Sequence, residues 1–139
     1  MTNHLHHNLQ IYLRICHDQV NRLAYISVIA GEKPYKIEKV ASEGVNTYFY
    51  EMGETKIELL EATNPDSPIA KFISKQKEGI HHIAFHVDNI HDELDRLTKE
   101  GFQQIGEIKP GADDKLICFL HPKSTNGVLV ELCQEANPE

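Results

Sequence analysis

Two glutamates stand inside apolar stretches of the chain, where a carboxylate is out of place. Glu58 lies in the run KIELLE, and Glu131 lies in GVLVELC. Burying a carboxylate is costly unless it is paired with a cation or binds a metal ion. Apolar neighbours on both sides of Glu131 predict a strand that is covered on both faces. For Glu58, strand alternation also allows a side chain that points to solvent.

Histidines at the start of another apolar stretch add a second type of metal-binding side chain. In IHHIAFHV, adjacent strand residues face opposite sides, so at most one of His81 and His82 points inward. His86 shares a face with His82. A single histidine in a strand is more often structural than a ligand. Imidazole and carboxylate together, however, suit Zn, Co, Mn, Fe or Ni, and the residues do not select one of these ions.

The elements that must position these residues alternate between strands and helices. Strands are expected over 5–15, 36–40, 46–52, 56–61, 80–87, 102–108, 116–120 and 128–133. Helices are expected over 18–30, shortly after 64–65, and over 91–100. Each half of the chain therefore follows the order β-α-β-β-β. The tail after Gln134 is expected to fray.

Short matching segments indicate an internal duplication. LHH at 5–7 and IHH at 80–82 open equivalent strands, while IEL at 57–59 and VEL at 130–132 lie in the last strand of each half. The offset is 75 residues from His7 to His82 and 73 residues from Glu58 to Glu131. We expect one domain over 1–139, with one module over about 1–76 and another over about 77–135. Two such modules predict an α+β fold with a cupped mixed sheet.

Composition and charge narrow the class of partner. The 139 residues carry a formal net charge of −7, which makes nucleic acid and anionic membranes unfavourable partners. The chain starts without a basic segment and a long apolar run, and no stretch is long and apolar enough to span a bilayer. We therefore expect a soluble cytoplasmic protein. Cys16, Cys118 and Cys133 lack paired spacing and are expected to be reduced and buried.

Two longer stretches carry a family resemblance. KIELLEATNPDSPIAKFISKQKEGIHHIAFHVDNI and GADDKLICFLHPKSTNGVLVELCQ resemble the methylmalonyl-CoA epimerases, over about Gly31 to Gln134. That family belongs to the vicinal-oxygen-chelate superfamily, so the resemblance implies a glyoxalase/bleomycin-resistance-like fold. It also implies a divalent metal ion (Co, Mn, Zn or Ni) held by Glu58, His82 and Glu131. Relatives carry Gln or Glu at the position of Glu58.

The first-strand ligand is where this chain departs from the family pattern. The family opens with a histidine, a short apolar strand and an Asp-led helix, whereas this chain reads HHNLQIYLRICHD. If Asp18 is aligned with the family's aspartate, the ligand position falls on Ile11 or Tyr12, and neither suits. If the histidine is aligned instead, His7 becomes the fourth ligand. His6 is the alternative in the opposite strand phase.

The activity that the resemblance implies is interconversion of (2R)- and (2S)-methylmalonyl-CoA. A proton is removed next to the thioester and returned on the other face, through a metal-stabilised enolate. Glu131 is the predicted base. The second base stays open between Glu43 and Glu58, because Thr47 occupies a position where some relatives carry Glu and cannot act as a base.

The substrate and the assembly complete the expectations from the resemblance. Lys123 and Ser124 are predicted to contact the acyl-CoA substrate, with a solvated turn as an equal alternative. A homodimer is expected. The rival functions are a lactoylglutathione lyase and a non-catalytic small-molecule-binding protein of the same fold, and a ring-cleaving dioxygenase is disfavoured by the extra carboxylate.

Overall fold

The computed structural model describes residues 11–17, 29 and 31–137. It contains two compact units. The first unit covers Tyr12–His81, and the second includes His82–Glu139. In the part of the chain that is described, no helix has the length and apolar character needed to cross a membrane.

The strands of the first unit follow the spatial order β2-β3-β4-β1. Their bounds are β1 Ile11–His17, β2 Lys36–Val40, β3 Val45–Met52 and β4 Thr55–Ala62. Neighbours among β2, β3 and β4 are antiparallel, and β1 runs parallel to β4. The β3–β4 turn contains Gly53 at φ 63°, a left-handed conformation that favours glycine. The expected strands over 36–40, 46–52 and 56–61 are confirmed.

Two elements were expected near the N-terminus, a strand over 5–15 and a helix over 18–30. Strand β1 covers 11–17, so the expected strand over 5–15 is confirmed in its second half, and its first half lies outside the described residues. The helix expected over 18–30 falls on a stretch in which only Ile29 is described.

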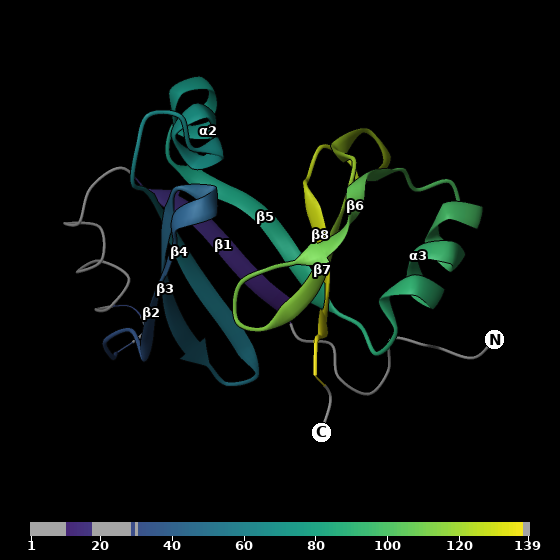
Figure 1. Ribbon diagram of the computed structural model, residues 1–139, viewed down its shortest axis with the longest axis horizontal. Helices are drawn as coiled ribbons and strands as arrows, with labels where there is room; N and C mark the ends of the chain where they lie inside the picture. Colours follow the sequence, from purple (N-terminus) through teal and green to yellow (C-terminus); the bar gives the residue numbers. More distant parts are fainter. Residues whose placement is uncertain (1–10, 18–28, 30, 138–139) are drawn as a thin grey trace. The chain divides into compact units, whose positions relative to one another are not determined.

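Opposite faces of the first unit bury different side chains. One face holds Tyr48, Tyr50 and Leu59, and the other holds Val45, Leu60 and Ile69. Ile69 belongs to helix α2 (Pro68–Gln76), which packs against the end of β4 (Figure 1). The helix starts at Ser67, whose hydroxyl accepts a 3.0 Å hydrogen bond from the Ala70 N–H. The helix expected after 64–65 is confirmed.

The strands of the second unit follow the order β5-β8-β7-β6. Their bounds are β5 Gly79–His86, β6 Gln104–Pro110, β7 Lys115–Leu120 and β8 Val130–Glu135. The β5–β8 pair is parallel, and β6, β7 and β8 are antiparallel neighbours. The core on one face contains Val87, Ile90, Leu94, Cys118, Leu120 and Leu132. Cys118 and Cys133 are buried, as expected.

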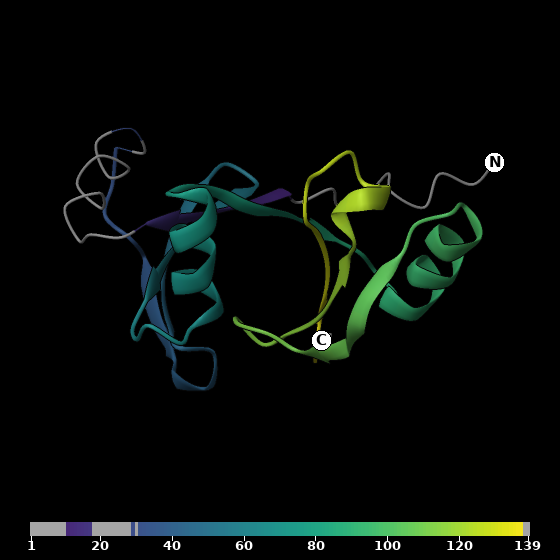
Figure 2. The same ribbon diagram turned by 90° about the horizontal axis from the view of Figure 1, so that it is seen from above.

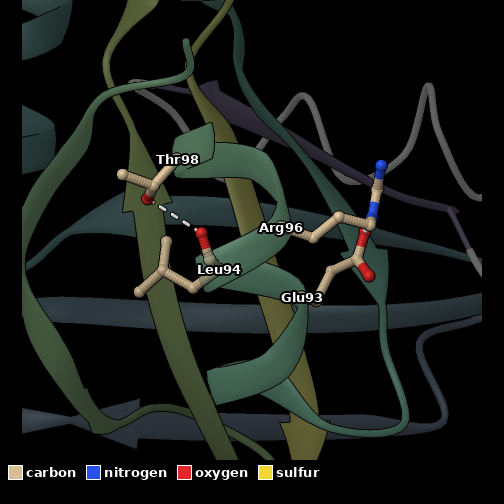
Figure 3. Close-up of polar contacts among 4 residues, drawn as sticks. All are labelled: Glu93, Leu94, Arg96 and Thr98. Atoms are coloured by element: carbon tan, nitrogen blue, oxygen red, sulfur yellow. Dashed lines mark hydrogen bonds and ion pairs between the residues drawn. The ribbon is translucent and has the colours of Figure 1, made fainter. Parts of the chain in front are cut away.

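Helix α3 (Ile90–Lys99) covers this core, and Figure 2 shows it against the β6–β7–β8 strands. Asn89 caps its start by accepting a 3.1 Å hydrogen bond from the Asp92 N–H. Figure 3 shows Arg96 donating to Glu93 and the Thr98 hydroxyl donating to the Leu94 carbonyl at 2.8 Å. The helix expected over 91–100 is confirmed, with its start one residue earlier.

The expectation of a frayed tail after Gln134 is wrong up to residue 137. Strand β8 continues to Glu135, and the Ala136 N–H donates to the Asp114 carbonyl at 3.0 Å. The Asn137 amide donates to the Asp114 carboxylate at 3.1 Å. These contacts tie the segment to the β6–β7 turn.

Candidate functional site

The second unit buries a histidine and a glutamate against each other. The Nε2 atom of His82 lies 3.0 Å from Oε2 of Glu131, and their side chains are 4% and 0% exposed. The two residues stand on the parallel strands β5 and β8, where Ala84 is the register partner of Glu131. Strand alternation puts His82, Ala84 and Glu131 on the face opposite the α3 core.

The neighbouring histidine behaves as the alternation rule requires. His81 does not share the buried position of His82, and its ring meets Phe72 of α2 edge-on at 4.8 Å. His82 is therefore the buried residue of the pair, and its role as a metal ligand stays a prediction.

An aromatic ring completes one side of the His82–Glu131 pair. Phe119 of β7 is the antiparallel partner of Glu131, and its ring meets the His82 ring edge-on at 5.6 Å. An aromatic neighbour keeps water away from the carboxylate and restrains the imidazole. Phe119 was not predicted from the sequence to be part of the site. It lies in the expected strand over 116–120, and antiparallel pairing with the expected strand over 128–133 places it opposite Glu131.

The charge of Glu131 also affects a neighbouring thiol. Burial, and then the negative charge of Glu131, raise the pKa of Cys118 to about 11. A thiol with that pKa stays protonated at neutral pH, where it is a poor nucleophile and a poor metal ligand. Cys118 is thus a core residue, as the sequence indicated.

The first unit buries a glutamate in the same way. Glu58 is 3% exposed, which excludes the solvent-facing alternative. Its antiparallel partner is Phe49, which is fully buried. Thr47 lies on the same face and is 2% exposed. Of the two candidates for a second base, Glu58 is buried, whereas Glu43 lies exposed in the 3-10 helix Ala41–Glu43.

The parallel neighbours of the two glutamates differ. Glu58 has Arg14 of β1 as its register partner, where Glu131 has Ala84. Two residues earlier in these strands stand Tyr12 in the first unit and His82 in the second. By register, therefore, Tyr12 occupies the position equivalent to His82. The predicted ligand His7 and its alternative His6 lie outside the described residues.

The donor types fit a divalent metal ion. A buried imidazole nitrogen and a carboxylate oxygen 3.0 Å apart are the ligand types that first-row divalent ions accept. Over the residues that the structure describes, no three His, Cys, Asp or Glu side chains gather into a group that could hold a metal ion. The His82–Glu131 pair supplies two donors within one unit, and the full ligand set stays a prediction.

The two predicted substrate contacts lie in the 3-10 helix Pro122–Ser124 between β7 and β8. The Ser124 hydroxyl donates to the His121 carbonyl at 2.8 Å and accepts from the Gln103 N–H at 3.1 Å. It therefore already has a structural role in the turn. Lys123 is exposed. Contact of either residue with a substrate stays a prediction.

Relatives of the chain include named epimerases. The ethylmalonyl-CoA/methylmalonyl-CoA epimerase of Cereibacter sphaeroides is 46% identical over 94 residues, which are 66% of this chain and 70% of that protein. The mitochondrial methylmalonyl-CoA epimerase of Homo sapiens is 42% identical over 113 residues, 80% of this chain. The chain spans 64% of the length of the human protein.

A solved structure and a family model agree with these relatives. The structure of a Streptomyces coelicolor methylmalonyl-CoA epimerase in complex with 2-nitronate-propionyl-CoA is similar, with a TM-score of 0.78, 28% identity, and coverage of 94% of each chain. Residues 14–119 match the model of the glyoxalase/bleomycin resistance protein/dioxygenase superfamily. The fold class expected from the sequence is confirmed, and the chain belongs to this superfamily.

Proposed function

We propose that the chain interconverts (2R)- and (2S)-methylmalonyl-CoA. The observation that carries the proposal is the buried His82–Glu131 pair, with its 3.0 Å contact, on the parallel strands β5 and β8. Support for the substrate comes from relatives that are named as methylmalonyl-CoA epimerases and are 42% and 46% identical to this chain.

The reaction requires a base in a site that is shielded from water. The proton between a thioester and a carboxylate is weakly acidic, and its removal leaves an enolate on the substrate. Glu131 takes this proton in our proposal, because its carboxylate is buried beside the Phe119 ring. Glu58, also buried and also opposite a phenylalanine, enters the proposal as a metal ligand, and the second base stays open between Glu43 and Glu58.

The residues proposed to hold a divalent ion are His7, Glu58, His82 and Glu131. A bound Co, Mn, Zn or Ni ion would supply Lewis-acid stabilisation of the negative charge that develops on the substrate oxygens. His82 then has a defined task, since its Nε2 atom points at the Glu131 carboxylate and keeps both donor atoms together.

The test is proton exchange at the α-carbon. The purified protein, loaded with Co²⁺, is incubated with (2R)-methylmalonyl-CoA in deuterated water, and NMR follows deuterium incorporation and appearance of the 2S isomer. We expect both, and we expect EDTA to stop them. The variant Glu131→Gln is tested in the same assay. Its matched control is Glu107→Gln, which changes an exposed glutamate of β6.

The rival functions give different results in the same assay. A folded protein that binds metal but exchanges no proton would contradict the proposal, and turnover of a glutathione hemithioacetal would then identify a lactoylglutathione lyase. Absence of both metal binding and turnover would favour a binding protein of this fold. The homodimer and the cytoplasmic location stay predictions, and light scattering of the purified protein tests the first.

A further inference from the structure

A second histidine lies on the same face as the His82–Glu131 pair. His82, Ala84 and His86 alternate along β5, while Phe85 and Val87 point into the core beneath α3. His86 is the register partner of Cys133, one alternation beyond the Ala84–Glu131 pair. The proposed function gives His86 no role.

The surroundings of His86 leave one of its nitrogens unsatisfied. Its Nδ1 atom is buried and has no hydrogen-bond partner among the described residues. Cys133, the register partner of His86 in β8, is itself paired with Ile117 of β7. Ile117 is apolar and 7% exposed. The Cys133 thiol donates to the Phe85 carbonyl at 3.5 Å. A buried polar atom without a partner costs stability, so its presence needs a reason.

The charges on this face indicate which ligand group would satisfy it. Glu131 is acidic, and Lys115, a buried cation on the same face, is engaged by Glu135. An anionic acyl group entering here meets a carboxylate and a cation that is already paired. An imidazole N–H can donate to a carboxylate oxygen from either ring nitrogen, with the tautomer set by its partners.

We infer that His86 donates a hydrogen bond to the free carboxylate of the acyl group, and so selects dicarboxylic acyl-CoA over simple acyl-CoA. This inference rests on the proposed function. Its core is the juxtaposition of an unsatisfied buried imidazole nitrogen with the His82–Glu131 pair on one face of the β5–β8–β7 strands.

The experiment compares two ligands that differ in the carboxylate alone. Calorimetry measures the Kd of methylmalonyl-CoA, as its equilibrated epimers, and of propionyl-CoA for the metal-loaded wild type, His86→Phe and His86→Gln. We expect His86→Phe to weaken methylmalonyl-CoA binding roughly 10- to 100-fold, the worth of a hydrogen bond to a charged group. Propionyl-CoA should bind as before. His86→Gln, which keeps a donor, should recover part of the loss.

Two controls separate recognition from structure. His91→Phe changes an exposed histidine of α3 and should leave both Kd values unchanged. The Tm of His86→Phe should equal or exceed that of the wild type, because the variant removes an unsatisfied buried nitrogen. Equal loss for both ligands, or no loss for either, would overturn the inference even if the wild type epimerises. A wild type that binds neither thioester would overturn the inference together with the proposed function.

Discussion

The two units bury a glutamate at equivalent points of equivalent hairpins, but the register partners of the two glutamates in the parallel strands differ. In the antiparallel direction the two environments agree, because Phe49 faces Glu58 and Phe119 faces Glu131. In the parallel direction they differ. Beside Glu58 the register partner is Arg14, and beside Glu131 it is the small residue Ala84.

The two units therefore agree in the hairpin and differ in the parallel strand. The hairpin needs an apolar partner to shield a buried carboxylate, so both units keep a phenylalanine there. In the second unit the parallel strand supplies the contact of the carboxylate, because β5 carries a histidine two residues before Ala84. In β1 the equivalent register position is Tyr12, so we expect Glu131 and Glu58 to have unequal roles.

The largest expected effect comes from the same isosteric change at both glutamates. Glu131→Gln removes the proposed base and should lower kcat about 10²- to 10⁴-fold. Glu58→Gln should lower kcat much less, because glutamine keeps an oxygen that can bind the proposed metal ion. Steady-state kinetics of epimerisation measures both, with metal content determined for each variant. Equal losses would mean that the two units contribute equivalent groups.

The next effect concerns the predicted fourth ligand, His7, which lies outside the described residues. If His7 is the fourth ligand, His7→Ala should weaken metal affinity at least about tenfold, since even residues that only orient ligands contribute that much. His6→Ala should have no effect. Competition with a fluorescent chelator gives the Kd for Co²⁺. An effect of His6→Ala alone would move the ligand to His6, while an effect of Tyr12→Phe alone would favour the register-equivalent residue.

A stability measurement examines the contact between His82 and Glu131 in the second unit. In the metal-free protein, His82→Leu deprives a fully buried carboxylate of a partner 3.0 Å away and should cost about 1–3 kcal/mol of unfolding free energy. The matched change His81→Leu removes only the edge-on contact with Phe72 and should cost less. Urea denaturation of both variants provides the comparison, and equal costs would contradict the importance of the pair.

The smallest effect is a change in the pH dependence of stability. Burial and the charge of Glu131 raise the pKa of Cys118 to about 11, against about 8.5 in an unfolded chain. The folded state therefore holds this proton more tightly, so the stabilisation is complete below pH 8.5 and is lost as the pH rises toward 11. Cys118→Ala should flatten this decline. Urea midpoints between pH 7 and pH 11 test it, and parallel curves for both proteins would refute it.

Local patterns in the sequence predicted part of the fold and part of the candidate site. Alternation and Gly53 predicted the β3–β4 hairpin, because both signals are local. Alternation also predicted that at most one of His81 and His82 points inward, and His82 is the buried one. Alternation did not predict whether Glu58 is buried. A two-residue period shows that a strand has two different faces, but it does not show which face is covered.

What escaped prediction depended on contacts between distant segments. The pairing of β5 with β8 sets the register that joins His82 to Glu131, and no local pattern encodes a parallel register. The tail was expected to fray because chain ends are often poorly ordered, whereas the structure ties Ala136 and Asn137 to the distant Asp114. Ser124 was predicted to contact the substrate. In the structure its hydroxyl bonds to the backbone of His121 and Gln103, and the contact with Gln103 joins residues that are distant in the sequence.

The parallel pairing of β5 and β8 has a consequence for how the protein folds. The hydrogen bond from Cys133 to Phe85 across these strands joins residues 48 positions apart, whereas the β3–β4 hairpin closes over a two-residue turn. Closing a long loop must precede such a contact, so it forms late and slows folding. A refolding chain should therefore acquire the β3–β4 hairpin before it brings His82 to Glu131, and metal or substrate affinity should be among the last properties to return.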